Sequence, residues 1–230
     1  MESSLNKRVI LLLSLFLIFS CKKQKSEINI LELSQLNNYK ITEKKINDSV
    51  GRIFGENNRY SIEGDMLLSN RSKQGWWNIK SKTNKDRFEI EYLFLDKQIE
   101  NQIKIFKNGV FDSKQSQYYH TYFSGRDNRY SFDIHFPESK NKTYNVDFDF
   151  IVTDTLQRKK VREGNMKCIQ NEDIYSCNVP VNKNEAVIGL ITKSSYSKDK
   201  DSVNLIIDRM YIKGEKQNAP SERVQLINPR

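Results

Sequence analysis

Alanine is almost missing from this 230-residue sequence, in which it occurs only at Ala186 and Ala219. Because alanine is the strongest helix former, its scarcity argues against a helical bundle. Four prolines and nine glycines also exclude collagen-like and proline-rich chains. Aromatic residues, by contrast, make up 11% of the chain, and they favour pleated, half-buried strands. The composition therefore predicts a mainly β protein.

The sequence also has few residues of the kinds that carry metal or nucleophilic chemistry. Its two histidines, His120 and His135, stand alone, and its three cysteines match no zinc-binding spacing. It contains neither a Gly-x-Ser-x-Gly motif nor a phosphate-binding loop. Asp147 and Asp149 share one face of a predicted strand, and we interpret them as its solvated side. We predict no catalytic residue, no metal and no cofactor, and a hydrolase whose site forms only on folding is the remaining enzymatic alternative.

The formal net charge of +9 comes from 38 lysines and arginines against 29 aspartates and glutamates. Most basic residues alternate with acidic ones, and only 22–25 and 158–162 are dense basic clusters. We interpret the second cluster as a loop between strands. Neither a recognition helix nor an RNA-binding strand motif accompanies the charge. The surplus therefore indicates a solvated surface, and we predict no nucleic-acid partner.

The N-terminus has the parts of a secretory signal. Lys7 and Arg8 precede the apolar run Val9–Phe19, which is about eleven residues long and too short for a membrane span of about twenty. The run ends in Ile-Phe-Ser-Cys at residues 18–21. This ending resembles the lipobox of bacterial lipoproteins, with Phe19 in place of the usual alanine or serine. An ordinary signal peptide with an incidental cysteine is the alternative.

The resemblance implies cleavage before Cys21 and acylation of that cysteine. Residues 1–20 are then a lipoprotein signal peptide, and the membrane is a partner through the N-terminal lipid. An aromatic residue before Ser-Cys, lysines after it and an alanine-poor chain are similar to lipoproteins of the Bacteroidota. We expect a protein of the cell envelope, lipid-anchored in the outer membrane and facing the periplasm. The lysines at 22–25 can also contact anionic headgroups.

Beyond the anchor, the composition divides the chain into a tether, two β-rich units and a tail. Residues 21–45 are polar and lysine-rich, and we expect a flexible tether there, with a short helix over 28–36. A β-hairpin unit is expected over 46–115 and a β-sandwich-like domain over 116–215. Residues 216–230 are expected to be a frayed tail.

The first β-rich unit shows the period of two that is typical of strands. Phe88, Ile90, Tyr92 and Phe94 alternate with charged or polar neighbours until Leu93. The preceding segment, Lys-Gln-Gly-Trp-Trp at 73–77, is followed by a hairpin and by Glu-Tyr at 91–92. This arrangement is similar to MORN-like repeats, in which a Gly-aromatic turn opens each two-stranded unit. The resemblance covers about sixty residues in one copy, and it implies an interaction or membrane-associated scaffold.

The second β-rich unit predicts an immunoglobulin-like β-sandwich. Val146, Phe148 and Phe150 alternate with polar residues, as a sheet with one solvated face demands. Short strands at this spacing, separated by polar turns at 137–142 and 194–202, are typical of that architecture. The expected strands are 130–136, 144–152, 166–170, 174–179, 186–192 and 203–212.

Cys168 and Cys177 remain as a pair once Cys21 carries lipid, in a compartment that favours oxidation. If Glu172 and Asp173 form the centre of a hairpin turn, Cys168 faces Cys177 at a non-hydrogen-bonded position. Facing side chains approach most closely there, so we predict a structural disulfide. A redox pair is the alternative, but the Cys-x-x-Cys spacing is missing.

Trp76 and Trp77 are the candidate binding residues. Adjacent strand residues point to opposite faces, so one tryptophan can be exposed, although we expect both to fill the core. Our first hypothesis is a non-enzymatic envelope lipoprotein that binds another protein through its β-modules. Neutralising a toxin, as an immunity protein does, is one form of it by analogy. The alternative is a glycan- or peptidoglycan-binding lipoprotein that uses exposed aromatic side chains.

The lipid anchor has a direct test. Metabolic labelling with an alkynyl fatty acid is expected to mark the protein, because the acyl chains are attached to Cys21. The Cys21→Ser variant is expected to lose the label completely while the protein is still made. Label that persists in the Cys21→Ser variant would contradict the lipoprotein prediction.

Overall fold

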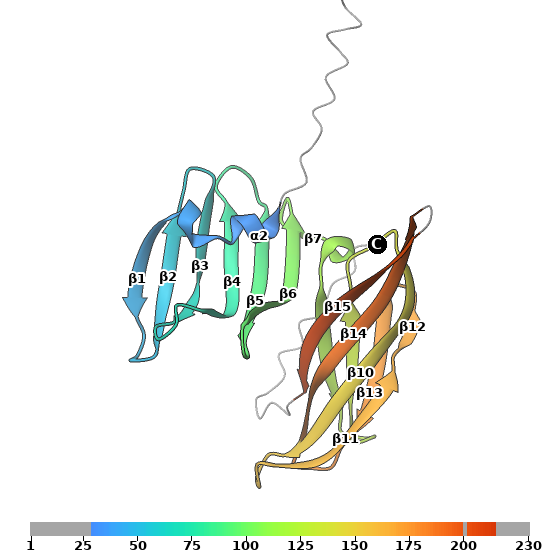
Figure 1. Cartoon of the computed structure of the whole chain (residues 1–230). Helices are drawn as coiled ribbons and strands as arrows, with labels where there is room; N and C mark the ends of the chain where they lie inside the picture. Colours follow the sequence, from blue (N-terminus) through green and yellow to red (C-terminus); the bar gives the residue numbers. More distant parts are fainter. Residues whose placement is uncertain (1–28, 200–201, 215–230) are drawn as a thin grey trace, which may run out of the picture. The chain divides into compact units, whose positions relative to one another are not determined.

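The computed structural model describes residues 29–199 and 202–214 (Figure 1). The predicted signal peptide, the predicted lipidation site Cys21 and the predicted tail lie outside the described residues. The fold is mainly β, as the composition predicted, and all of its strand pairs are antiparallel within this range. In the described part of the chain, no helix is long and apolar enough to span a bilayer.

The short helix expected over 28–36 is present as α2 (Ile30–Leu33), and the 3-10 helix η1 (Leu36–Asn38) follows. The flexible tether expected as far as residue 45 ends earlier, because strand β1 begins at Lys40. All six residues of β1 are exposed. An edge strand of this kind has no buried face, so its sequence carries no hydrophobic period.

The first β-rich unit is a seven-stranded antiparallel sheet in which each strand pairs with the next along the chain (Figure 1). Asn108 and Gly109 form its last tight turn with φ of 52° and 83°, as the Asn-Gly pair favours. The strands are β1 (Lys40–Lys45), β2 (Val50–Glu56), β3 (Tyr60–Leu67), β4 (Lys73–Ser81), β5 (Arg87–Phe94), β6 (Gln98–Lys107) and β7 (Val110–Phe111).

One face of this sheet is buried and holds a lysine. Lys73 Nζ donates a hydrogen bond to the main-chain oxygen of Ser34 at 2.5 Å. The same ammonium lies 5.3 Å from the ring centroid of Trp77 and 4.7 Å from that of Tyr92. Burial lowers the pKa of Lys73 to about 8, although the nearby Glu100 acts in the opposite direction. The lysine therefore fastens the segment after α2 to the sheet.

Gly64 makes room for Trp77 on this buried face. A Cβ at Gly64 would lie 2.3 to 2.5 Å from three atoms of the Trp77 indole. The β3–β4 register shifts between Glu63 and Asp65, and Trp77 Nε1 donates to the Asp65 main-chain oxygen at 3.0 Å. Gly64 thus lies at a bulge over which the indole packs.

The second β-rich unit is the predicted sandwich, and it consists of two four-stranded sheets (Figure 1). The chain forms four successive hairpins that alternate between the sheets. One sheet has the order β12-β13-β9-β8, with β8 (Tyr118–Ser124), β9 (Arg129–His135), β12 (Ile169–Asn171) and β13 (Ile174–Pro180). The other has the order β11-β10-β14-β15, with β10 (Lys142–Asp154), β11 (Lys159–Lys167), β14 (Glu185–Asp199) and β15 (Ser202–Gly214).

The sandwich core lies between these two sheets. Phe132 of β9 and Phe148 of β10 meet edge to face with ring centroids 5.4 Å apart, and both are fully buried. Val179 and Ile191, from β13 and β14, are also fully buried and belong to the same cluster. Burial of such side chains contributes about 1.5–3 kcal/mol each to stability.

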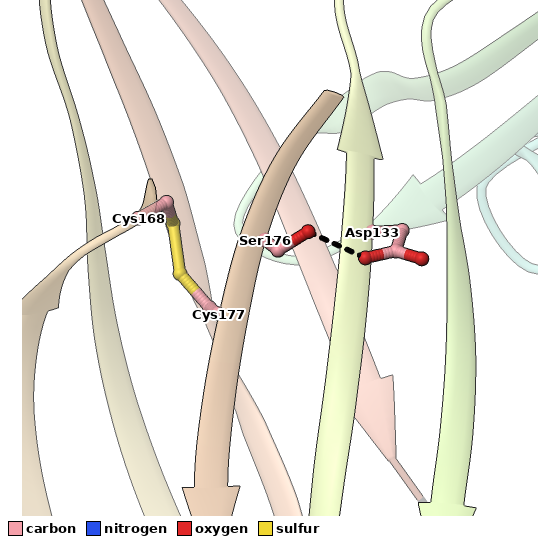
Figure 2. The surroundings of a disulfide bond; sticks show 4 residues. All are labelled: Asp133, Cys168, Ser176 and Cys177. Atoms are coloured by element: carbon pink, nitrogen blue, oxygen red, sulfur yellow. Dashed lines mark hydrogen bonds between the residues drawn. A yellow bond between two sulfur atoms is a disulfide. The ribbon is translucent and has the colours of Figure 1, made fainter. Parts of the chain in front are cut away.

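The predicted disulfide joins Cys168 to Cys177, with Cα atoms 4.8 Å apart (Figure 2). The hairpin register is also the predicted one, because Asn171 faces Ile174. Cys168 lies between β11 and β12, where the chain passes from one sheet to the other, and its N–H still donates to Val146 of β10. The disulfide therefore fixes β13 to the point at which the chain changes sheets.

Three boundaries predicted in this unit are wrong. The strand expected over 166–170 is broken at Cys168 into β11 and β12, because the chain changes sheets there. The basic cluster at 158–162 is mostly the start of β11 and not a loop. The turn expected over 194–202 is shorter, since β14 extends to Asp199 and β15 begins at Ser202. In the second and third cases polar strand residues resemble a loop in sequence.

The close contact of Gly64 with Trp77 has a measurable consequence. Gly64→Ala is expected to lower the free energy of unfolding by about 1–3 kcal/mol, because the Trp77 indole must move out of its packed position. The matched control is Gly125→Ala, whose Cβ would have one neighbour, at 3.9 Å, and should leave stability nearly unchanged. Urea unfolding of both variants measures the difference. Equal stability of the two variants would contradict this role of Gly64.

Candidate functional site

A groove of about 860 Å³ lies on the outward side of the sheet formed by β10, β11, β14 and β15. Outward here means away from the other sheet of the sandwich. Its apolar floor is formed by Ile151, Ile188, Leu190 and Tyr211, which come from three strands. Leu93 and Leu95, at the end of β5 and just after it, complete the wall. Cavities of this size and apolar character are typical of binding sites.

Strand register brings the floor of the groove together. Ile151 faces Ile188 across β10 and β14, and Leu190 faces Tyr211 across β14 and β15. In strand β10 Phe148 and Val152 are buried, so Asp149 and Ile151, which have the opposite parity, point outward. Ile151 is 36% exposed and Ile188 is 40% exposed. These apolar side chains are therefore open to a ligand.

The sequence contains a signal for this groove that we did not use. Phe150, Ile151 and Val152 are consecutive, as are Val187 and Ile188 before Gly189. A run of adjacent apolar residues places such side chains on both faces of a strand. Since one face of such a strand is buried in the core, this run predicts that the other, outer face of the sheet is also apolar.

Polar groups surround the apolar floor. Asn165 of β11 donates to Asp149 Oδ1 of β10 at 2.6 Å, and Glu163 and Lys213 line the same groove. Asp149 was predicted on the solvated side of its strand, and it faces the groove there. The arrangement is an apolar centre with a polar and charged rim, as protein-binding surfaces have.

The structure brings the two histidines together on the outward side of the other sheet. His120 of β8 faces Asp133 of β9, and their neighbours Tyr118 and His135 also face each other. The rings of Tyr118 and His135 stack at 4.2 Å, and the two imidazoles are 6.3 Å apart. We call these four residues, with the exposed Tyr122 on the same side of β8, the histidine face. Strand pairing therefore joins residues that stand alone in the sequence.

A serine lies beside the histidine face. Ser176 Oγ of β13 donates to Asp133 Oδ1 at 2.7 Å (Figure 2). In a nucleophilic triad the serine hydroxyl bonds to the histidine, which the carboxylate orients. Here the serine bonds directly to the carboxylate, so this geometry orients Asp133 and does not activate Ser176.

Burial lowers the pKa of both histidines. The nearby Lys104 lowers the pKa of His120 further, and Asp133 opposes the shift. The pKa of His135 is lowered by burial and then by His120, against Asp133 and Asp173. Both rings therefore resist protonation in the folded protein. Within residues 29–199 and 202–214, no group of three or more His, Cys, Asp or Glu side chains is placed to hold a metal ion.

The two candidate tryptophans lie on opposite faces of the first sheet. Trp77 is fully buried, so the structure excludes it as a binding platform. Trp76 is 38% exposed, which corrects the expectation that both fill the core. Lys104 Nζ lies 4.7 Å from the centroid of a Trp76 ring. One approach to that indole is thus occupied by a cation, and its availability to a ligand is reduced.

No protein-family model matches this chain, and neither a curated protein nor a solved structure is found to match it. The groove and the histidine face therefore rest on their own geometry.

The histidine pair predicts how stability depends on pH. Folding lowers both pKa values below the unfolded value of about 6.5, so the unfolded chain binds protons more readily. The stability that neutral histidines contribute is present above that pH and is lost as the pH falls below it. Urea midpoints are therefore expected to fall between pH 7 and pH 5.

The control is a double variant, His120→Phe with His135→Phe, which keeps an aromatic ring against Tyr118 but cannot titrate. Because the chain has only two histidines, its urea midpoint should change much less over the same range. An unchanged slope in the double variant would show that other groups cause the pH dependence.

Proposed function

We propose that the protein is a lipid-anchored lipoprotein of the cell envelope that binds another protein in the groove on its sandwich, and that its role is binding and not catalysis. The observation that carries the proposal is the groove itself. It offers about 860 Å³ above an apolar floor, enough for several side chains of a partner. Exposed apolar surface with a polar rim is characteristic of protein interaction sites.

The lipid anchor rests on the N-terminal sequence and on the expected envelope compartment. The basic pair, the short apolar run and Ile-Phe-Ser-Cys at 18–21 support cleavage before Cys21. A disulfide between Cys168 and Cys177 fits an oxidising compartment. We place the protein in the outer membrane, facing the periplasm. An anchored domain there meets its partner at a membrane surface, where even a modest affinity per site suffices.

A glycan ligand is the second candidate, and the histidine face favours it. Tyr122 is 54% exposed and lies beside Ser131 and Asn178, which hydrogen-bond each other at 2.6 Å. His120 and Asp133 add a donor and an acceptor on the same side. An aromatic ring among such polar groups suits a sugar, which has both an apolar face and hydroxyls.

The test changes the groove floor without touching the core. Ile188→Asp places a carboxylate on the floor of the groove, and burying that charge against a partner is costly. After cross-linking in the native host, the partner retained by the wild-type protein should be lost. With the purified partner, affinity should fall at least tenfold, which is about 1.4 kcal/mol.

The matched control is Leu156→Asp. Leu156 is also an exposed apolar residue, at 73%, but it lies in the turn after β10 and outside the groove. This variant should keep full binding. If both variants bind alike, the groove is not the site. If only polysaccharide is retained, and Tyr122→Ala abolishes that retention, the glycan proposal replaces the protein one.

A further inference from the structure

Strand β15 is an edge strand whose two halves differ. Near its end, side chains hydrogen-bond to its outer main-chain groups. Asn101 bonds to both the N–H and the oxygen of Tyr211, at 2.7 and 2.9 Å. Gln117 donates to the Arg209 oxygen, and Tyr119 accepts from the Lys213 N–H. The half from Arg209 onward is thus covered by hydrogen-bonding side chains.

In the first half of β15, no described residue provides such cover. The β14–β15 pairing continues without a register shift, so Val203, Leu205 and Ile207 present their N–H and C=O groups to the same outer edge as Arg209. Within the described residues, the outward main-chain N–H and C=O groups of these three residues have no hydrogen-bond partner. Their side chains are 66%, 66% and 47% exposed. This stretch therefore combines a bare edge with apolar side chains.

The edges formed by β1, β7, β11 and β12 are protected against strand addition. Strand β1 carries three lysines and a glutamate in six residues, and β11 carries lysines and a bulge in its pairing with β10. Strands β7 and β12 are only two and three residues long. Charge, bulges and short length are the usual devices that prevent edge pairing. The first half of β15 is seven residues long, pairs with β14 without a bulge and carries one charged residue, Asp208, which points to an edge that is used.

The open stretch is symmetric about one residue. It begins at Ser202, where the strand starts, and ends at Asp208, before the covered Arg209. Leu205 is its midpoint. If β15 of a second copy pairs antiparallel about Leu205, its Ser202 lies opposite Asp208 of the first copy. Ser202 is the first residue of that strand, so the strand pairing stops there. The second copy therefore fills the bare edge and stops where the covered half begins.

We propose that β15 pairs with β15 of a second copy of this chain, antiparallel, about a two-fold axis at Leu205. In this register Val203 faces Ile207 of the other copy, and Leu205 faces its equivalent. All three belong to the set whose main-chain groups point outward, so each facing pair exchanges two hydrogen bonds. The apolar side chains of one copy contact the same set of side chains in the other copy, as an isologous contact requires. The inference goes beyond the proposed function, since it involves none of the residues that line the groove.

The test is site-directed disulfide formation in the full-length protein in its native membrane. Facing residues of a hydrogen-bonded pair have Cα atoms about 5.5 Å apart, which is within reach of a disulfide. Leu205→Cys should therefore give a covalent dimer under mild oxidation. Val203→Cys is the control. In the proposed register the two copies of residue 203 are four positions apart along the paired strands, or about 13 Å, so their cysteines should not form a disulfide. Co-expressed Val203→Cys and Ile207→Cys chains should link to each other.

A second measurement tests the dimer without relying on disulfide formation. Leu205→Lys places like charges against each other at the axis and should weaken dimerisation at least tenfold in sedimentation of the detergent-solubilised protein. Leu156→Lys, at another exposed apolar residue, should leave the dimer unchanged. Unchanged urea midpoints confirm that both variants are folded.

Three outcomes would overturn the proposal. Equal linking at 203 and 205 would indicate random collision, and a monomeric wild-type protein would exclude the dimer. A link from position 205 to a different protein would assign the edge to a foreign strand. Loss of partner binding in Ile188→Asp with the dimer intact would separate the groove from this interface.

Discussion

The structure depends on one packing constraint: its strands must bury one face, and the described residues contain almost no helix to cover them. In the sandwich the cover is a second sheet, and Phe132 and Phe148 meet at its centre. Once these rings define the inside, the period of two assigns every other side chain on these strands to the outside. The groove and the histidine face are both consequences of that assignment. Their positions are set by core residues on the opposite side of the same strands.

Features that depend on neighbouring residues could be predicted from the sequence. The alternation of Phe88, Ile90 and Tyr92 predicted a strand where the structure has β5. Turn chemistry and parity placed Cys168 opposite Cys177 because they are only nine positions apart in the sequence. The mainly β composition was equally local, since it sums the preferences of single residues. Each of these inferences needed no knowledge of which distant strands would pair.

Features that depend on distant pairing, or on strands without a buried face, could not be predicted in the same way. Strands β1 and β11 are largely exposed, and their lysines resemble those of a tether or a loop. The groove floor joins residues 151, 188 and 211 through long-range pairing. His120 and His135 meet only because the β8–β9 hairpin has one particular register. For Trp76 and Trp77, alternation separates the faces, but the position of Gly64 decides which indole is buried.

The two surface features of the sheet that contains β15 are linked by geometry. Ile188, Leu190 and Tyr211 lie on the same outward side as Val203, Leu205 and Ile207, because register along β14 and β15 is unbroken. A two-fold axis between antiparallel edge strands is perpendicular to the sheet, so the proposed dimer would present both grooves on one side. Two grooves on one rigid sheet bind a repeated or dimeric partner with a high effective concentration. The proposed lipid at each N-terminus would hold both copies on one membrane. Pairing would then serve binding by raising avidity, and it would remove the bare edge, which is otherwise an aggregation hazard.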